Sequence, residues 1–369
     1  MSKKRSQPKQ EDIVESIKKI AQDIWNSIQE MQAPEMSMPV RNLQNVDYDK
    51  EKGYFTLLDK EKIRTLTATT IKTFAQTLLM LSLSKNLVLS DDLSTKREVY
   101  YIAYNWGDAA FKDQPESDAV MEDVEAMLGQ TREHLGFIAG EKAGVVAGDL
   151  VVVDIDSETK QPIEIDCRKF GTGSYSIPSI VEHFSFKTSA KFILAIEVVG
   201  AFERLNKHKY WKTANCIIIG MGGVPTRSTR RFIRKLADEH NIPVYVFTDG
   251  DPYGYGSIYR TLKVGSGNAA HVNEFFCVPQ AKFIGVTPQD IIDYKLPTHK
   301  LKDVDVKKIK DLIKNDPFIK QHKEWQRALE HLAQMKVRVE SQAFAAHSLN
   351  YVIDTYLPQK LADPSKWLP

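Results

Sequence analysis

The sequence predicts a mixed α/β and α+β protein, in which a doubly wound, Rossmann-like parallel sheet follows a winged-helix domain and an N-terminal arm. Two nearly continuous apolar runs, residues 191–199 and 216–219, predict strands buried on both faces of a parallel sheet. The second run ends in glycines, a helical segment follows at residues 226–240, and another strand at residues 244–247. An order of strand, loop, helix and strand is typical of a sheet whose site lies at the carboxyl ends of its strands.

Composition places the chain among ordinary soluble globular proteins. Its 369 residues suffice for two or three domains, and 42% of them are hydrophobic and 27% charged. A net charge of +2 requires any nucleic-acid contact to come from local basic clusters. Cys167, Cys216 and Cys277 are far apart, which argues against a disulfide framework or a zinc site. No apolar stretch long enough to span a bilayer and no secretory signal are evident, so no membrane partner is expected.

Residues 1–68 are expected to form an N-terminal segment that contains one helix. Residues 1–10 are polar and basic, so we expect disorder there. Apolar residues recur with helical period over residues 12–31 and predict an amphipathic helix that packs against another subunit or domain. Residues 34–59 have an irregular pattern, with one candidate strand at residues 53–58.

Residues 69–155 are expected to form a winged-helix domain of the CAP-like type, in which one helix enters the DNA major groove. Helical patterns cover residues 66–85 and 117–128, and between them Thr95 and Glu98 form a capping-box pattern that starts a third helix. The apolar segments that predict a hairpin and a further strand, the wing, lie at residues 135–140, 144–148 and 150–153. An α+β lobe of another kind is the alternative.

Residues 156–369 are expected to hold the sheet domain and the C-terminal helices. A polar connector at residues 157–178 leads to a core at residues 180–285. The helical segments that should support the sheet and contribute to a dimer contact lie at residues 298–314, 320–333 and 336–356.

Three carboxylates follow the predicted strands. Glu197 interrupts the first apolar run, whereas Asp249 and Asp251 come directly after residues 244–247. A glutamate fits a buried strand only at its end and beside a cation. Carboxylates two residues apart on an extended chain point the same way. Oxygen ligands of this kind suit Mg²⁺, so the acids predict a magnesium site, with a structural acid cluster as the alternative.

A helix with several tyrosines offers a candidate nucleophile. Spacing alone does not choose among Tyr100, Tyr101 and Tyr104. A tyrosine is a weak nucleophile at neutral pH unless a neighbour helps to remove its proton or stabilises the oxyanion. Arg97 lies four residues before Tyr101 on the same helix face and could serve this purpose or hold a phosphate. Core packing is the alternative role for such tyrosines.

Basic residues form two candidate DNA contacts. Arg227, Arg230 and Arg231 lie on the predicted helix after the glycine-rich turn and could bind the DNA backbone. A solvated helix face is the alternative. Arg132 and His134, at the edge of the predicted wing, are further candidates for a DNA contact.

Four motifs, taken together and in order, resemble those of one enzyme family. They are Lys96-Arg97-Glu98-Val99-Tyr100-Tyr101, Glu197, Gly222-Gly223-Val224-Pro225 with Thr229-Arg230, and Asp249-Gly250-Asp251-Pro252-Tyr253-Gly254. The glutamate and the Asp-x-Asp pair resemble the Toprim domain of topoisomerases, primases and related nucleases. The combination, over about residues 70–360, resembles the A subunits of archaeal type IIB DNA topoisomerases (topoisomerase VI) and the related meiotic double-strand-break transesterase.

The resemblance implies a role for each motif. Tyr101 matches the family's reactive tyrosine, and Arg97 would assist it. Glu197, Asp249 and Asp251 would hold Mg²⁺, and Glu197 could instead act as general acid or base. Attack by the tyrosine on DNA would give a transient 5′-phosphotyrosyl double-strand break. Religation after strand passage would relax and decatenate DNA.

The same resemblance implies an extended N-terminal arm at residues 34–59, and it implies partners. In this family each active site takes its tyrosine from one protomer and its metal from the other, so a homodimer acting on duplex DNA is expected. The sequence shows no P-loop, so ATP-driven opening would need a GHKL-type ATPase B subunit in an A₂B₂ assembly. The N-terminal helix is the candidate for contact with this ATPase. The enzyme is expected to be archaeal, cytoplasmic and nucleoid-associated.

Three alternatives remain open. In a Toprim nuclease or primase-like protein, water attacks the phosphate and Tyr101 is structural. A winged-helix DNA-binding regulator would have a degenerate sheet domain and no cleavage activity. A meiotic-type double-strand-break transesterase would share the tyrosine chemistry.

Overall fold

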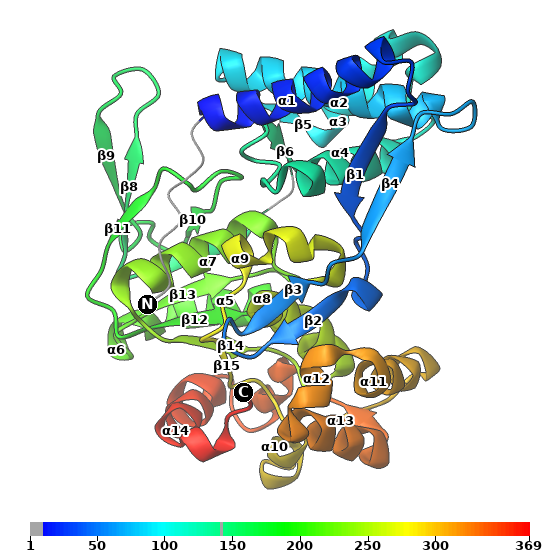
Figure 1. Ribbon diagram of the computed structural model, residues 1–369. Coiled ribbons are helices and arrows are strands. Elements are labelled where there is room, and N and C mark those ends of the chain that lie inside the picture. The colour runs from blue at the N-terminus through cyan, green and yellow to red at the C-terminus, as the bar shows by residue number, and fades with distance from the viewer. Residues whose placement is uncertain (1–9, 141–142) are drawn as a thin grey trace. The chain divides into compact units, whose positions relative to one another are not determined.

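The computed structural model describes residues 10–140 and 143–369, which divide into two compact units (Figure 1). Among these residues, unit 1 comprises residues 10–46, 57–140 and 267–272, and unit 2 comprises residues 47–56, 143–266 and 273–369. The disorder expected for residues 1–10 falls outside the described residues except at Gln10, which begins a helix. No helix in the described part of the chain combines the length and the apolar character that a bilayer crossing requires.

Four helices build the core of unit 1. They are α1 (Gln10–Gln29), α2 (Ile71–Ser90), α3 (Lys96–Ile102) and α4 (Gln114–Leu128). Apolar residues of all four, among them Ile17, Met80, Val99 and Val124, form one buried cluster. Helix α2 extends five residues beyond the predicted end, because Leu87 and Val88 are buried in this cluster too. It ends at Asp91, whose left-handed conformation (φ 54°) stops the helix.

Short strand pairs accompany these helices. Strand β1 (Glu35–Pro39) pairs antiparallel with β4 (Glu61–Thr65), and β5 (Ser94–Thr95) pairs parallel with β6 (Phe137–Ile138). The strand predicted at residues 53–58 is present as β3 (Tyr54–Leu57), which pairs with β2 (Val46–Asp49), and most of this pair belongs to unit 2.

The hairpin predicted between residues 135–140 and 144–148 is wrong. Strand β6 pairs with β5, whereas β7 (Val145–Gly148) belongs to the main sheet of unit 2. The physical reason is burial: Val146 and Ala147 are 0% and 2% exposed, and their side chains point to opposite faces of the sheet. A solvated wing buries only one face, whereas the interior of a large sheet buries both.

A six-stranded sheet forms the centre of unit 2. Its strands lie in the order β10 (Tyr175–Ser176), β7, β13 (Cys216–Gly220), β12 (Phe192–Ile196), β14 (Val244–Phe247) and β15 (Lys282–Phe283). The last four are parallel, and three of them, β13, β12 and β14, are the strands that the sequence predicts. Strands β7 and β10 add an antiparallel edge. The interior strands are almost wholly buried, which accounts for their continuous apolar sequence.

Two crossovers set the position of the site in this sheet. Helices α5 (Val199–Lys207) and α6 (Tyr210–Thr213) connect β12 to β13, and α7 (Arg227–His240) connects β13 to β14. Because β13 and β14 lie on opposite sides of β12, right-handed crossovers place α5 and α7 on opposite faces. The chain therefore reverses direction across the sheet between β12 and β14, and a crevice opens at the carboxyl ends of these strands.

Further elements complete unit 2. A three-stranded sheet has the order β11 (Ser185–Lys187), β8 (Val151–Ile155) and β9 (Pro162–Asp166), so the predicted connector at residues 157–178 contains strands. The remaining helices are α8 (Arg260–Val264), α9 (Asn273–Phe276), α10 (Pro288–Asp293), α11 (Asp303–Asn315), α12 (Pro317–Gln321), α13 (Lys323–Met335) and α14 (Leu357–Ala362).

The helix predicted over residues 336–356 is wrong. Lys336 adopts a left-handed conformation (φ 56°) and ends α13, and strand β17 (Val337–Arg338) follows and pairs with β16 (His299–Lys300). After it come a 3₁₀ segment (Ser341–Ala346) and a π-helical turn (Val352–Tyr356). Val339 hydrogen-bonds to Gly250 in both directions, so pairing with a distant segment replaces the helical hydrogen bonds here.

Candidate active site

The three predicted acids lie at the carboxyl ends of β12 and β14. The Glu197 N–H donates to the carbonyl of Phe247, which continues the parallel pairing of the two strands by one residue. The N–H of Asp249 donates to Oε2 of Glu197 at 3.0 Å. The chain therefore brings together two strand ends that are 52 residues apart in sequence.

A third segment, which the sequence analysis missed, completes this acid cluster. The Ser341 N–H donates to Oδ1 of Asp249 at 2.7 Å, and Val339 pairs with Gly250. A Cβ atom on Gly250 would lie 2.6 Å from Cγ1 of Val339 and 2.9 Å from the carbonyl oxygen of Val286, so only glycine fits between the two aspartates. No motif in the sequence marks this segment, which reaches Asp249 through the backbone N–H and the side chain of Ser341.

The turn after β14 holds the second aspartate. Oδ1 of Asp251 accepts the N–H groups of Tyr253 (2.9 Å) and Gly254 (2.6 Å). These bonds fix the carboxylate at the start of the helical segment that follows. The side chain is thereby oriented by the backbone of its own loop.

Burial and mutual repulsion disfavour the charged forms of these acids. Burial, followed by the charges of Asp249 and Asp251, raises the pKa of Glu197 to about 8. Burial also raises the pKa of Asp249 and of Asp251, although N–H donors from the backbone oppose the shift. Three partly buried acids that resist ionisation together are a common feature of functional sites, since a cation would relieve the repulsion.

The residues fit a magnesium ion in donor chemistry and in charge. All three side chains offer carboxylate oxygen, which Mg²⁺ prefers, and each has a raised pKa, chiefly because of burial and further because of neighbouring carboxylates, so a cation would stabilise their charged forms. Among the described residues, no group of three or more acidic, histidine or cysteine side chains is arranged as a ready coordination shell. One oxygen of each carboxylate instead accepts a backbone N–H.

The tyrosine helix lies in unit 1 and begins as predicted. Oγ1 of Thr95 accepts the N–H of Glu98, and the Glu98 carboxylate accepts the N–H of Thr95, which forms a complete capping box for α3. Tyr101 is 50% exposed on this helix. Nη2 and Nε of Arg97 lie 3.3 and 3.4 Å from its hydroxyl oxygen. A guanidinium at this position can stabilise negative charge on the oxygen or hold a phosphate.

The neighbouring tyrosines have different surroundings. Tyr100 packs against the core cluster of unit 1 and accepts a hydrogen bond from the hydroxyl of Tyr104 at 2.9 Å. Tyr104 is exposed, and its ring stacks on that of Tyr101 with 6.0 Å between centroids. Of the three tyrosines, Tyr101 alone has an arginine beside its hydroxyl among the described residues.

Three family models match successive parts of the chain. A model of type IIB DNA topoisomerases matches residues 72–137, and a model of the all-β domain of the DNA topoisomerase VI α subunit matches residues 140–190. The Toprim domain shared by the topoisomerase 6 A subunit and Spo11 matches residues 192–361, which include all three acids.

Curated relatives match over the whole length. The A subunit of type 2 DNA topoisomerase 6 from Methanocaldococcus jannaschii is 51% identical, with 100% of this chain and 98% of the relative covered. The chain belongs to the family of topoisomerase 6 A subunits and Spo11. A protein of the same name from Methanothermobacter thermautotrophicus is 36% identical, with 96% of this chain and 98% of the relative covered. Another from Pyrococcus abyssi is also 36% identical, with both chains covered completely.

Membership confirms the resemblance seen in the sequence. The predicted class of enzyme, a type II DNA topoisomerase family, is confirmed, as is the Toprim domain. A Toprim domain is a metal-binding domain, generally for Mg²⁺. The roles of individual residues stay predictions, which the geometry above supports to different degrees.

The basic residues on α7 that are predicted to contact DNA make contacts with other residues of unit 2. Nε and Nη2 of Arg231 donate to the two carboxylate oxygens of Glu182 at 2.8 and 2.7 Å. The guanidinium groups of Arg227 and Arg230 lie 5.5 and 5.6 Å from the ring centroid of Phe276. These contacts favour a structural role, and DNA binding by these residues stays a prediction.

The two candidates near the predicted wing lie in unit 1. Arg132 is 8% exposed, and its Nε donates to Glu133 at 3.2 Å. His134 is partly buried, and its N–H donates to Oγ1 of Thr131. A contact between DNA and Arg132 would require this side chain to leave its carboxylate, so DNA contacts by the pair also stay a prediction.

Proposed function

We propose that the chain is the DNA-cleaving A subunit of an ATP-dependent type IIB topoisomerase. The observation that carries this proposal is the gathering of Glu197, Asp249 and Asp251 at the point where the sheet order reverses, in a Toprim domain. The full-length match to topoisomerase 6 A subunits supplies the reaction class. The helices α2, α3 and α4 would form the DNA-reading part of a winged-helix domain.

The proposed reaction exchanges one phosphate ester for another. The hydroxyl oxygen of Tyr101 attacks a DNA phosphorus, the bond between that oxygen and phosphorus forms, and the bond from phosphorus to the 3′ oxygen breaks. The phenolic proton is lost and a proton is taken up by the leaving 3′ oxygen, so the products are a 5′-phosphotyrosine and a 3′ hydroxyl. The reverse steps reseal the strand and need no further energy source.

Each residue near the phosphate has its own proposed role in the reaction. Arg97 is placed to stabilise the tyrosine oxygen or to hold the phosphate. Glu197, Asp249 and Asp251 would hold Mg²⁺, which supplies Lewis-acid stabilisation of charge on the phosphate and on the leaving oxygen. Glu197, with a pKa of about 8, could also hold or release a proton near neutral pH.

We propose an assembly of two A and two B subunits. Two tyrosines are needed to cut both strands of duplex DNA, which requires a homodimer. The relatives are named as the A component of an enzyme, and these names imply at least one further component. A GHKL-type ATPase B subunit would supply the energy for strand passage, and the amphipathic helix α1 is our candidate for its contact.

Trapping of covalent complexes tests the proposal. The purified chain with its B subunit is incubated with supercoiled DNA, ATP and Mg²⁺ and then stopped with denaturant. Wild type should leave DNA attached to protein, and Tyr101→Phe should abolish the adduct. Tyr100→Phe is the matched control, because it removes the neighbouring hydroxyl and should still form the adduct.

The alternatives give other outcomes of the same assay. A Toprim nuclease would cut the DNA without forming an adduct, and Tyr101→Phe would cut as well as wild type. A DNA-binding regulator would neither cut nor change after Asp249→Asn. A meiotic-type transesterase would form the adduct without relaxing DNA. An adduct that persists in Tyr101→Phe and disappears in Tyr100→Phe would show that the assignment of Tyr101 as the nucleophile is wrong.

A further inference from the structure

A cavity of about 280 Å³ lies in unit 2, between helices α10 and α13 and the C-terminal residues. Its lining includes neither the three acids of the candidate metal site nor the segment that completes them. Pro288, Trp367 and Leu368 provide much of the apolar wall, and the remaining lining is mostly polar or charged. Cavities of mixed lining and approximately this size are typical of sites for small molecules.

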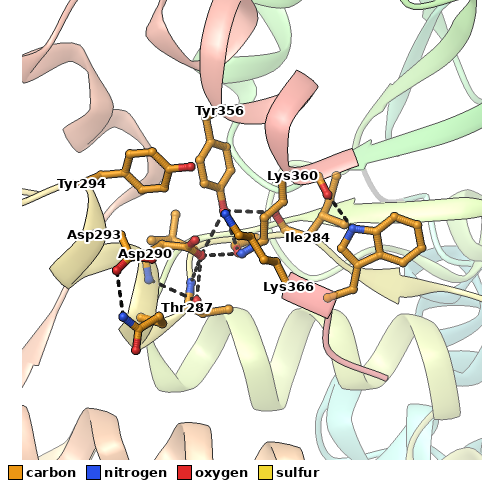
Figure 2. Close-up of polar contacts among 12 residues, drawn as sticks. Ile284, Thr287, Asp290, Asp293, Tyr294, Tyr356, Lys360 and Lys366 are labelled. Atoms are coloured by element: carbon orange, nitrogen blue, oxygen red, sulfur yellow. Dashed lines mark hydrogen bonds and ion pairs between the residues drawn. The ribbon is translucent and has the colours of Figure 1, made fainter. Parts of the chain in front are cut away.

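A buried ion pair forms one wall of this cavity. Nζ of Lys360 lies 2.6 Å from Oδ2 of Asp290, and their side chains are 1% and 3% exposed. The same Oδ2 accepts the N–H and the hydroxyl of Thr287 and lies 3.2 Å from the hydroxyl of Tyr356, as Figure 2 shows. The charge of Asp290 is therefore shared among several donors.

The ammonium of Lys360 retains capacity to bind an anion. It carries three N–H donors, and among the described residues Asp290 is its one hydrogen-bond acceptor. Lys366 lies close enough that its positive charge acts on Lys360 and, after burial, helps to lower the pKa of Lys360. An anion between the two ammonium groups would relieve this repulsion and use the remaining donors.

Further positive charge comes from α13. Arg327 and His331 are four residues apart on one face of this helix, and both line the cavity. On the opposing helix, Asp293 accepts a hydrogen bond from the side-chain amide of Gln289 at 2.8 Å. Three cations, Arg327, Lys360 and Lys366, thus share the lining with two carboxylates, and both of these already accept hydrogen bonds. Nζ of Lys366 also lies 4.0 Å from Oδ2 of Asp363, which is outside the lining.

We propose that this cavity is a binding site for the phosphate group of a small molecule. The several oxygen atoms of a phosphate can accept hydrogen bonds from Lys360, Lys366 and Arg327 at once, which a carboxylate does less well. The apolar wall beside these cations would contact the body of the ligand. Inorganic phosphate and a nucleoside monophosphate share the required chemistry, and the size of the cavity admits either.

Calorimetric titration of the full chain tests the proposal. Inorganic phosphate and adenosine monophosphate are titrated separately, in EDTA so that the candidate metal site does not contribute. The double variant Arg327→Gln/Lys366→Gln removes two exposed cations without disturbing the buried pair and should lower affinity about tenfold or more. Lys323→Gln is the matched control, since it removes a charge from α13 outside the cavity and should bind as wild type does.

A second variant tests the buried ammonium separately. Asp290→Asn/Lys360→Met removes both charges of the pair and should abolish phosphate binding in a chain that still melts cooperatively. Tighter binding of the monophosphate than of phosphate identifies a nucleotide-sized ligand, and equal binding identifies phosphate alone. The proposal is overturned if wild type binds neither compound, if acetate binds as tightly as phosphate, or if the Arg327/Lys366 double variant retains wild-type affinity.

Discussion

The N–H of Asp249 donates to Oε2 of Glu197 at 3.0 Å, so one carboxylate of the candidate metal site is tied to the backbone of another. This bond links the ends of β12 and β14 at the switch point of the sheet. Any change in the ionisation of Glu197 therefore acts directly on the loop that carries both aspartates.

We predict that the metal-free chain loses stability as pH rises from about 4.5 to about 8. The folded pKa of Glu197 is raised from 4.5 to about 8, so the folded state binds the proton more tightly than the unfolded state in this window. Stability therefore falls with increasing pH there. Urea unfolding in EDTA at several pH values would measure the effect.

Glu197→Gln provides the control for this pH dependence. The amide does not titrate, so the free energy of unfolding of the variant should depend less on pH than that of wild type. The variant should also be more stable than wild type at pH 8 in EDTA. Added Mg²⁺ should stabilise wild type at pH 8 and should stabilise the variant less. Identical pH profiles for the two proteins would contradict the prediction.

We predict that Gly250→Ala destabilises the chain by about 1–3 kcal/mol, because the added Cβ overlaps Val339 and the carbonyl of Val286. The same displacement should weaken Mg²⁺ binding, since Gly250 lies between the two aspartates. Val339→Ala removes one of the overlapping atoms, so the double variant should recover part of the lost stability. Thermal unfolding and Mg²⁺ titration would measure both effects. A Gly250→Ala variant as stable as wild type would show that the loop moves to accommodate the added Cβ.

We predict that Arg97→Ala slows DNA cleavage about a hundredfold, because it removes a cation placed beside the reactive oxygen. Arg97 is exposed, so the free energy of unfolding should not change. Arg97→Lys should be intermediate, since an ammonium keeps the charge and loses the planar fork. Single-turnover adduct formation would measure the rates. Equal rates for the alanine variant and wild type would remove Arg97 from the reaction.

We predict that Lys360→Met destabilises the chain by about 3–5 kcal/mol, because it leaves Asp290 buried without its cation. Asp290→Asn/Lys360→Met should recover most of this loss, since neither charge then remains. Denaturant unfolding of the two variants would separate the cost of an unpaired charge from the cost of the pair. A single variant as stable as the double variant would show that water reaches Asp290.

Local patterns were sufficient for much of the fold. The apolar runs of β12, β13 and β14 predict buried parallel strands, because only a sheet covered on both faces accommodates them. The capping box of Thr95 and Glu98 predicts the start of α3 to the residue. The order of these elements places Glu197 and Asp249 at one sheet edge before any coordinate is known.

Patterns within one segment gave wrong answers where a distant segment decided the structure. Strand β7 has the sequence of a hairpin strand and instead pairs with β13, where Val146 and Ala147 are covered on both faces. Residues after Lys336 have helical composition, and their backbone groups bond to Gly250 and Asp249 instead.

The sequence by itself determined the family, the central sheet and the acids at its edge, because strand burial and helix capping depend on residues close together in the chain. Only the tertiary structure decided that Ser341 binds Asp249 and that Lys360 pairs with Asp290, across 92 and 70 residues. Such contacts depend on which apolar surfaces cover each other after the chain has folded. Backbone donors and paired charges brought together in this way leave no periodic pattern in the sequence.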